Sequence, residues 1–292
     1  METDEDRSQN YVSVEISGGL GNQLFQLAMI THYLKTANDK KKSLVLKYEE
    51  ILPNKYNLPR KTFWSTIFQH QFPLMKEDEF NKIEFNTYFE CDPHVFSPPP
   101  YNFDRHIFFR GYYQSFKYID DDVREIMRLY VYNHKNYYNV AEKHYKEVLD
   151  HFGNNINLDD IVSVHIRRTD YVMDSDYHYN LGLDYYRQAL EITNKKYVVV
   201  FSDDIQWCKQ NIARNLYQYT NIFFVDIGIV EFEFILMSMF KHNIIANSTF
   251  SLWASFISPH RDKLIVAPKN WYSEKGPKEW QEIYHKYITH TI

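Results

Sequence analysis

Short apolar runs alternate with segments of helical periodicity along the second half of the chain. The apolar runs have the length of buried strands and span residues 161–166, 197–201, 222–225, 243–246 and 263–267. Helical periodicity occupies the segments between them, at residues 184–192, 204–214, 231–240 and 250–257. Because buried strands that alternate with helices form a parallel sheet, this half predicts a doubly wound α/β unit.

The first half begins with a related pattern. A predicted strand at 11–17 is followed by the turn GGLGNQ, a helix at 24–34 and a strand at 43–48, which together make one βαβ unit. The proline-bearing segment 52–105 predicts an irregular, helix-bearing insertion. Further along, the pattern predicts a strand and then one long helix, at 107–115 and 122–152.

Polar clusters follow three of the predicted strands in the second half. They are HIRRTD at 165–170, SDD at 202–204 and ANST at 246–249. The carboxyl ends of parallel strands meet at one edge of a sheet, and ligands bind there. The agreement of three clusters therefore predicts a binding site at this edge.

Two adjacent arginines, Arg167 and Arg168, stand at the end of the first of these strands. One interpretation is a surface ion-pair cluster that includes Asp170. The other is a two-pronged clamp for phosphate, since arginine keeps its charge and offers bidentate donors. His165 either adds a polar contact to that clamp or is a hydrogen-bonded core histidine.

The turn GGLGNQ matches neither the dinucleotide fingerprint GxGxxG nor Walker A. Gly18, Gly19 and Gly21 either serve a tight strand-to-helix turn or let a ligand approach the backbone amides that begin the next helix. Asn22 and Gln23 are uncharged side chains suited to hydrogen bonds with hydroxyls or a phosphate oxygen.

The other two clusters also have two interpretations. One carboxylate of the pair Asp203 and Asp204 suffices to cap the following helix, and the other can accept from a ribose hydroxyl or a base N–H. Asn247, Ser248 and Thr249 are good helix caps and equally good phosphate ligands.

Two acidic strings are candidates for metal binding, because many sugar transferases hold a divalent ion with a DxD motif. The strings Asp120–Asp122 and Asp174–Asp176 match that motif, but neither follows a buried strand. The first is better explained as the acidic first turn of the long helix. No His/Cys cluster has zinc spacing, so no metal site is predicted.

Composition narrows the class of protein. The 292 residues carry a net charge of −5, which argues against a nucleic-acid-binding protein. Cys91 and Cys208 form no disulfide framework, so a reducing compartment is expected. No apolar run reaches the roughly 18–20 residues of a membrane span, and METDEDRSQN lacks the pattern of a signal peptide. A cytoplasmic protein is expected.

Four stretches resemble the α-1,2-fucosyltransferase family in sequence, order and spacing: ISGGLGNQLFQLA, HIRRTDY, FSDDIQWC and NSTFSLWAS. The resemblance spans residues 11–270 and implies an α/β, GT-B-like fold with two Rossmann-like domains facing a cleft. It implies inverting transfer of L-fucose from GDP-β-L-fucose to an acceptor glycan, with an α-1,2 linkage to galactose or a similar sugar. It further implies GDP-fucose as donor substrate, no resident cofactor and no metal.

The resemblance also divides the chain into expected domains. They are a disordered tail at 1–10, an acceptor-side domain at 11–152, a nucleotide-sugar-binding domain at 153–275 and a C-terminal helix at 276–292. The acceptor is expected to be recognised by the irregular segment 52–115 and its aromatic side chains.

The resemblance implies roles for single residues. Arg167 becomes the clamp for the departing diphosphate, Asn22 a second residue of the catalytic centre, and Asp170 the partner that holds the arginines. Asp174 and Asp176, just beyond the motif, are candidates for the general base.

A larger set is expected to contact the nucleotide sugar. His165 and Asp203 are candidates for guanine or ribose, and Ser248 and Thr249 for the phosphates. The other residues of the motifs that are expected in this set are Gly19, Gly21, Gln23, Arg168, Asp204, Asn247 and Phe250. Two positions depart from the family pattern: Thr169 stands where glycine is frequent, and Leu252 where an aromatic residue is frequent.

Three other functions compete with this interpretation. A transferase of the same fold could use another nucleotide sugar. A non-catalytic glycan-binding protein would need aromatic side chains but no diphosphate clamp, so the arginine pair counts against it. A Rossmann oxidoreductase is disfavoured by the missing GxGxxG.

Overall fold

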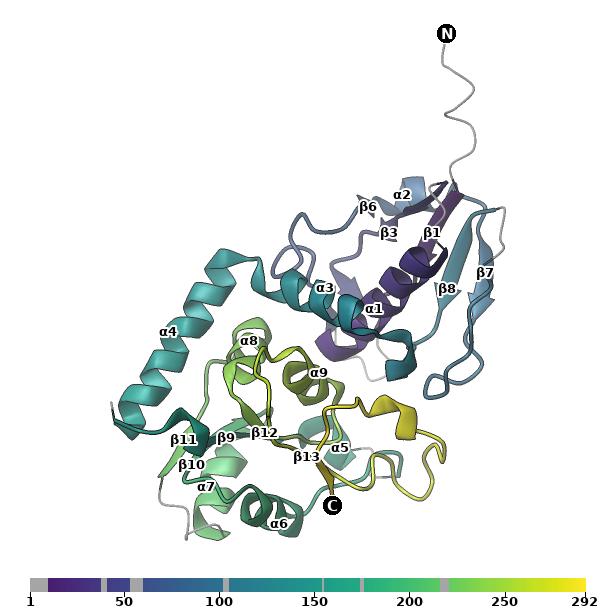
Figure 1. Ribbon diagram of the computed structural model, residues 1–292. Coiled ribbons are helices and arrows are strands. Elements are labelled where there is room, and N and C mark those ends of the chain that lie inside the picture. The colour runs from purple at the N-terminus through teal and green to yellow at the C-terminus, as the bar shows by residue number, and fades with distance from the viewer. Residues whose placement is uncertain are drawn as a thin grey trace. The chain divides into compact units, whose positions relative to one another are not determined.

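The computed structural model describes most of the chain (Figure 1). The described residues are 10–37, 41–52, 60–101, 105–153, 155–173, 176–215 and 221–292. Of these, the residues up to 134 together with 281–283 form one compact unit, and the residues from 135 to 280 together with 284–292 form the other. The tail predicted at 1–10 lies outside the described residues except for Asn10, which begins the first strand.

The first unit is built on a four-stranded parallel sheet with the order β2-β1-β8-β7. Its strands are β1 (Asn10–Val14), β2 (Lys42–Leu44), β7 (Asn86–Phe89) and β8 (Ile107–Arg110). Helix α1 (Leu20–Ala37) follows β1 and packs beside α3 (Asp121–Tyr132) (Figure 1). The predicted βαβ unit is confirmed, because β1 and β2 pair in parallel across α1.

The predicted strand at 43–48 is broken at Val45. The backbone N–H of Val45 still donates to Val12 of the sheet, whereas that of Leu46 donates to Pro73. The chain therefore changes pairing partner within this strand. The other short elements of this unit are β3 (Leu46–Lys47), β4 (Ile51–Leu52), β5 (Arg60–Lys61), β6 (Leu74–Met75) and α2 (Glu77–Phe80).

The single helix predicted at 122–152 is two helices in the structure, α3 and α4 (Lys135–Phe152), separated at residues 133–134. The physical reason is that the two helices bury side chains in different cores. Val123, Met127 and Val131 of α3 are buried in the first unit. In the second unit, the α4 ring of Tyr145 lies 5.1 Å from that of Phe240.

The second unit contains a six-stranded parallel sheet with the order β11-β10-β9-β12-β13-β14. Its strands are β9 (Ile161–Ile166), β10 (Tyr197–Ser202), β11 (Asn221–Phe224), β12 (His242–Ile244), β13 (Ile265–Ala267) and β14 (His290–Thr291). Its remaining helices are α5 (Thr169–Met173), α6 (Leu183–Thr193), α7 (Ile205–Asn215), α8 (Val230–Met239) and α9 (Thr249–Ile257). The doubly wound α/β prediction is confirmed.

The strand order locates the switch point of this sheet. The chain runs outward from β9 through β10 to β11, then returns to β12 on the other side of β9. Every residue of β9 is buried. Val162, Val164 and Ile166 pack in the core with α6 and α7, whereas the ring of His165 lies 5.3 Å from that of Phe250 on α9. Helices therefore cover both faces beside the switch point.

The C-terminal helix predicted at 276–292 is wrong. This segment holds a short 3₁₀ turn at Gln281–Ile283 and the strand β14 beside β13. The backbone N–H groups of Thr289 and Ile292 donate to Ile265 and Ala267. Without β14, β13 would be an edge strand with unpaired backbone groups. Residues 289–292 satisfy those groups instead.

Candidate active site

The three polar clusters of the second unit meet at the carboxyl edge of its sheet. Strands β10, β9 and β12 are direct neighbours, and each leads into one cluster. HIRRTD therefore stands between SDD and ANST, at the switch point. In doubly wound sheets this is the place where ligands bind.

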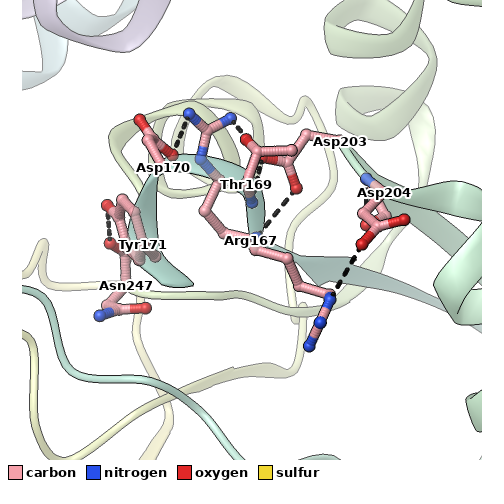
Figure 2. Close-up of polar contacts among 9 residues, drawn as sticks. Arg167, Thr169, Asp170, Tyr171, Asp203, Asp204 and Asn247 are labelled. Carbon is pink, nitrogen blue, oxygen red and sulfur yellow. Dashed lines mark hydrogen bonds and ion pairs between the residues drawn. The ribbon is translucent and has the colours of Figure 1, made fainter. Parts of the chain in front are cut away.

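Arg167 is the centre of an ion-pair network (Figure 2). Its Nη2 lies 2.7 Å from Oδ1 of Asp170, and its Nη1 lies 3.1 Å from Oδ2 of Asp203. Burial alone would lower the pKa of Arg167, but the carboxylates of Asp203 and Asp170 raise it. The guanidinium therefore stays charged. The two ion pairs engage one N–H donor on Nη1 and one on Nη2, out of the five that a guanidinium carries.

Asp203 holds the turn between β9 and α5. Its Oδ1 accepts from the backbone N–H of Arg168 at 2.9 Å, and its Oδ2 accepts from that of Thr169 at 3.2 Å. The Thr169 hydroxyl also donates to Asp203, as Figure 2 shows. Together with the Arg167 ion pair, these contacts turn both carboxylate oxygens toward protein donors. The predicted contact of Asp203 with guanine or ribose stays a prediction.

Arg168 has different partners from Arg167. Its Nε lies 3.2 Å from Oδ2 of Asp204, and its guanidinium carbon lies 3.6 Å from the centre of the Trp207 ring. Asp204 also accepts from the backbone N–H of Trp207 at 3.2 Å, as a residue at a helix start does. The two guanidinium groups therefore have separate partners, and that of Arg167 is the less exposed, at 19% against 26% for Arg168.

Tyr171 and Asn247 connect HIRRTDY to the end of β12. The Tyr171 hydroxyl donates to the Asn247 carbonyl at 2.7 Å (Figure 2). The Asn247 amide donates to the carbonyls of Tyr179 and Trp271 at 2.9 and 2.7 Å. Asn247 is almost fully buried, so these bonds fix the loop before α9.

The start of α9 lies beside a buried histidine. Ser248 occupies the N-cap position, but within the described residues its side chain accepts no capping hydrogen bond. His165 is 4% exposed, its ring packs on Phe250, and its Nδ1 has no hydrogen-bond partner in the described part of the chain. Burial lowers the pKa of His165 to about 3, with a further contribution from Arg167 and an opposing one from Asp203. His165 is therefore a neutral imidazole against Phe250, the second residue of a helix whose first backbone N–H groups favour anions.

Of the two candidates for the general base beyond the motif, the structure describes only Asp176. Asp174 lies outside the described residues. The Asp176 side chain is 76% exposed, and its Oδ2 lies 2.8 Å from Nζ of Lys275. This ion pair holds Asp176 at the surface, and its role as the general base stays a prediction.

The glycine turn forms the carboxyl edge of the first sheet. Gly18 has a φ of +74°, as the tight-turn interpretation predicted, and Gly19 has open space where a side chain would stand. Gly21 is buried within α1. The Gln23 amide donates to the carbonyls of Gly18 and Lys61 at 3.0 and 2.9 Å, so its nitrogen serves the turn. Asn22 is partly exposed on the first turn of α1.

The acidic string at 120–122 has the structural role that was predicted for it. Asp120 is the N-cap of α3, where its carboxylate accepts from the backbone N–H of Val123 at 2.8 Å. Within the described ranges, no group of three or more His, Cys, Asp or Glu side chains is arranged to hold a metal ion. Among the helices described, none is long and apolar enough to cross a bilayer.

Sequence reasoning missed several residues that organise the two edges. Tyr171 ends the motif HIRRTDY, and Trp207 lies one helical turn after Asp204, so the sequence pattern could have indicated both. Glu90 had no such signal, because it follows β7 in the segment 52–105, which was predicted to be irregular. Gln114 was placed at the end of the strand predicted at 107–115, but β8 ends at Arg110 and Gln114 lies in the turn that follows it.

Glu90 is a half-buried carboxylate behind the edge of the first sheet. Its Oε2 accepts from the backbone N–H groups of Tyr112 and Tyr113 at 2.8 and 2.9 Å. Its Oε1 is buried and has no hydrogen-bond partner among the described residues. Burial raises the pKa of Glu90 to about 7, with a smaller contribution from Asp92 and opposing ones from the two N–H groups. This carboxylate therefore titrates near neutral pH.

We expect Glu90→Gln to stabilise the protein at pH 8 but not at pH 4.5. A raised pKa means that the folded state favours the protonated form, so stability is full below the unfolded pKa and is lost as the pH rises toward 7. Glutamine keeps an acceptor for the N–H groups and avoids the cost of burying a charge. We expect the variant to gain about 1–2 kcal/mol of stability at pH 8 for this reason. Melting temperatures of both proteins across this range check it, with the exposed Glu84→Gln as control. An equal shift at both pH values would contradict the assignment.

Two α/β units with parallel sheets, the second with a charged arginine at its switch point, agree with the GT-B-like fold that was predicted from the sequence. Comparison with known sequences makes this more specific. The chain belongs to glycosyl transferase family 11, whose model matches residues 2–289.

Two curated relatives are proteins of Escherichia coli. The O-antigen biosynthesis glycosyltransferase WbnK is 32% identical over 174 residues, which cover 56% of this chain and 54% of that protein. An alpha-1,2-colitosyltransferase is 32% identical over 154 residues, which cover 44% of this chain and 53% of that protein. The matched stretches thus span about half the length of these relatives.

A crystal structure of POFUT1 in complex with GDP has a similar fold. The TM-score is 0.50 at 15% sequence identity, and the match covers 87% of this chain and 95% of that chain. At this identity the likeness supports the fold, and it agrees with the GT-B-like class predicted from the sequence.

Proposed function

We propose that the protein transfers L-fucose from GDP-β-L-fucose to a hydroxyl of an acceptor glycan, with formation of an α-1,2 linkage to galactose or a similar sugar. The observation that carries the proposal is Arg167, a charged and largely buried guanidinium at the switch point. A relative named for α-1,2 transfer of a sugar supports the linkage.

The proposed reaction is a single displacement with inversion. The acceptor oxygen forms a bond to C1 of the sugar as the bond from C1 to the diphosphate oxygen breaks, and the acceptor proton passes to a base. Negative charge then grows on the departing GDP. Arg167 would stabilise that charge, because a donor fixed in advance by Asp170 and Asp203 needs no reorganisation. Ser248 and the N–H groups at the start of α9 would bind phosphate oxygens, and the neutral His165 would bind guanine or ribose.

The second candidate is the same transfer with a different nucleotide sugar. The relative named as a colitosyltransferase makes a colitosyl donor the first one to test after GDP-fucose. A non-catalytic glycan-binding protein stays the third candidate, but it gives no role to a diphosphate clamp.

The test is transfer of labelled sugar from GDP-fucose and from GDP-colitose onto a panel of β-galactosides and other short glycans. We expect turnover with GDP-fucose that persists in excess EDTA, since cationic side chains would replace a metal at the diphosphate. A preference for GDP-colitose would favour the second candidate, and glycan binding without turnover the third. Loss of activity in EDTA that Mn²⁺ restores would contradict the metal-free site.

A further inference from the structure

Three neighbouring strands of the first sheet, β1, β8 and β7, end in a row of three side chains (Figure 1). Glu15 directly follows β1, Arg110 is the last residue of β8, and Phe89 is the last residue of β7. Arg110 and Phe89 are opposite each other in the register of their strands. The backbone N–H of Glu15 donates to the carbonyl of Phe109, the residue before Arg110, at 2.8 Å. The row therefore runs across the carboxyl edge of the sheet, where parallel sheets bind ligands.

The row stands on the face of the sheet that α1 does not cover. Successive residues of a strand point to opposite faces, and the ring of Phe109 packs toward α1, at 4.8 Å from that of Tyr33. On the opposite face, Phe80 of α2 packs on Phe108, with a ring distance of 5.8 Å. Arg110 lies two residues further along β8 on that same face. The side chains of the row thus extend beyond the cover that α2 provides.

Two members of the row form an ion pair that leaves hydrogen-bonding atoms unused. Nη2 of Arg110 lies 2.7 Å from Oε1 of Glu15, and the two side chains are 44% and 38% exposed. Within the described residues, Oε2 of Glu15 and the Nη1 and Nε groups of Arg110 have no hydrogen-bond partner. Because the two charges compensate each other, the pair suits the hydroxyl groups of a neutral ligand better than a phosphate or a cation.

The ring of Phe89 places an apolar surface next to this pair. Phe89 is 62% exposed, and the guanidinium carbon of Arg110 lies 5.5 Å from the centre of its ring. A pyranose sugar matches such a surface, because it has a face of C–H groups and a rim of hydroxyl groups. The C–H face can pack on the aromatic ring while the hydroxyl groups contact the polar side chains that fix its orientation.

The turn after β8 holds the row in place. Glu90 follows β7, and its carboxylate accepts from the backbone N–H groups of Tyr112 and Tyr113 at 2.8 and 2.9 Å. Gly111 follows β8 and leaves no space for a side chain, since an added Cβ would stand 2.4 Å from Oε2 of Glu90. The ends of β7 and β8 are therefore tied together, so the row needs little ordering when a ligand binds.

We propose that Glu15, Arg110 and Phe89 form a subsite for a neutral pyranose of the acceptor glycan. The C–H face of the sugar packs on Phe89, and its hydroxyl groups contact the ion pair. This inference rests on the proposed function, which requires an acceptor site, and it extends the predicted acceptor segment 52–115 to Glu15. The subsite contributes to the affinity for the acceptor and supplies no group to the bond that forms.

The test is binding of lactose, a β-galactoside, to the full chain, measured by titration with saturation-transfer NMR. We expect Phe89→Leu, which keeps an apolar side chain but removes the ring, to weaken binding by about five- to tenfold. Phe89→Tyr keeps the ring and should bind lactose like the wild type. Leu129→Ala is the matched control, because it removes exposed apolar surface of the same unit on α3 and should leave binding unchanged.

Turnover gives a second readout, which separates this proposal from the proposed function. With GDP-fucose as donor, Phe89→Leu should raise the KM for the acceptor by a similar factor and change the KM for GDP-fucose little. Lactose binding that depends on Phe89 but leads to no transfer would refute the transferase and support the subsite. Transfer with an unchanged acceptor KM in Phe89→Leu would refute the subsite alone.

Three further outcomes would overturn the subsite. They are wild-type lactose binding by Phe89→Leu, an equal loss of binding in Leu129→Ala, and a wild-type dimer that Phe89→Leu dissociates, since a second copy would then cover the ring. If Phe89→Leu does not fold, Arg110→Leu, which removes the exposed donors, has to weaken lactose binding instead.

Discussion

Replacement of Arg167 by lysine is expected to lower kcat by about 10²–10³-fold, the usual cost of removing one fixed donor to a developing charge. Arg167 bridges Asp170 and Asp203 with two different nitrogens. Lysine keeps one charge, but a single ammonium cannot span both carboxylates and still present a planar set of donors to a diphosphate. Because the clamp acts most as charge grows, GDP affinity should change less than kcat. Steady-state kinetics and GDP titration on this variant measure both quantities.

Arg187→Lys is the matched control for this prediction. Arg187 also forms an ion pair with an aspartate three residues away, at 2.7 Å from Asp184, but it lies exposed on α6. A surface pair of this kind contributes about 0–1 kcal/mol to stability, and its loss should leave kcat unchanged. Turnover of Arg167→Lys close to that of Arg187→Lys would refute the clamp. A poorly folded Arg167→Lys would be recognised by its melting temperature, and Arg167→Ala with added guanidinium would then separate the two effects.

The arrangement of the second unit could be predicted because its pattern is locally consistent. Its apolar runs are long enough to fill a buried strand, and β9 was predicted with the same limits that it has in the structure, Ile161–Ile166. The rule that ligands bind at the carboxyl ends of parallel strands then brought HIRRTD, SDD and ANST to one edge without knowledge of the strand order.

The partners within that edge could not be predicted in the same way. Periodicity places Arg167 and Arg168 at the end of a strand. It does not predict which of the two aspartates that follow β10 forms an ion pair with each arginine. The short helix α5 was missed because five residues are too few for a periodic signal.

The short strands that precede β8 could not be predicted from the sequence pattern. Strands of two residues are held by pairing with other segments rather than by their own composition, as β4 is by β5 and β6 is by β3. The contacts of Glu90 with the backbone of Tyr112 and Tyr113 depend on pairing of the same kind, because they arise where β7 and β8 lie side by side.

Asp203→Asn is expected to destabilise the second unit by about 2–4 kcal/mol, because it weakens a largely buried ion pair and sets an N–H₂ group against backbone donors. The carboxylate of Asp203 meets Arg167, the backbone N–H groups of Arg168 and Thr169, and the Thr169 hydroxyl. An amide has one oxygen and can satisfy only part of this set. The melting temperature should fall by about 5–15 °C, and kcat should fall with it, since Arg167 loses one of its two supports.

Asp204→Asn is the matched control. The Asp204 side chain is 36% exposed, against 19% for that of Asp203, and it pairs with Arg168 instead of Arg167. The melting temperature of Asp204→Asn should fall by less than half as much as that of Asp203→Asn. If Asp203 served mainly to bind guanine or ribose, Asp203→Asn would melt like the wild type and lose GDP affinity alone. Thermal melts with and without GDP distinguish the two roles, because a ligand contact changes only the shift that GDP produces, whereas a structural contact changes the melting temperature of the free protein.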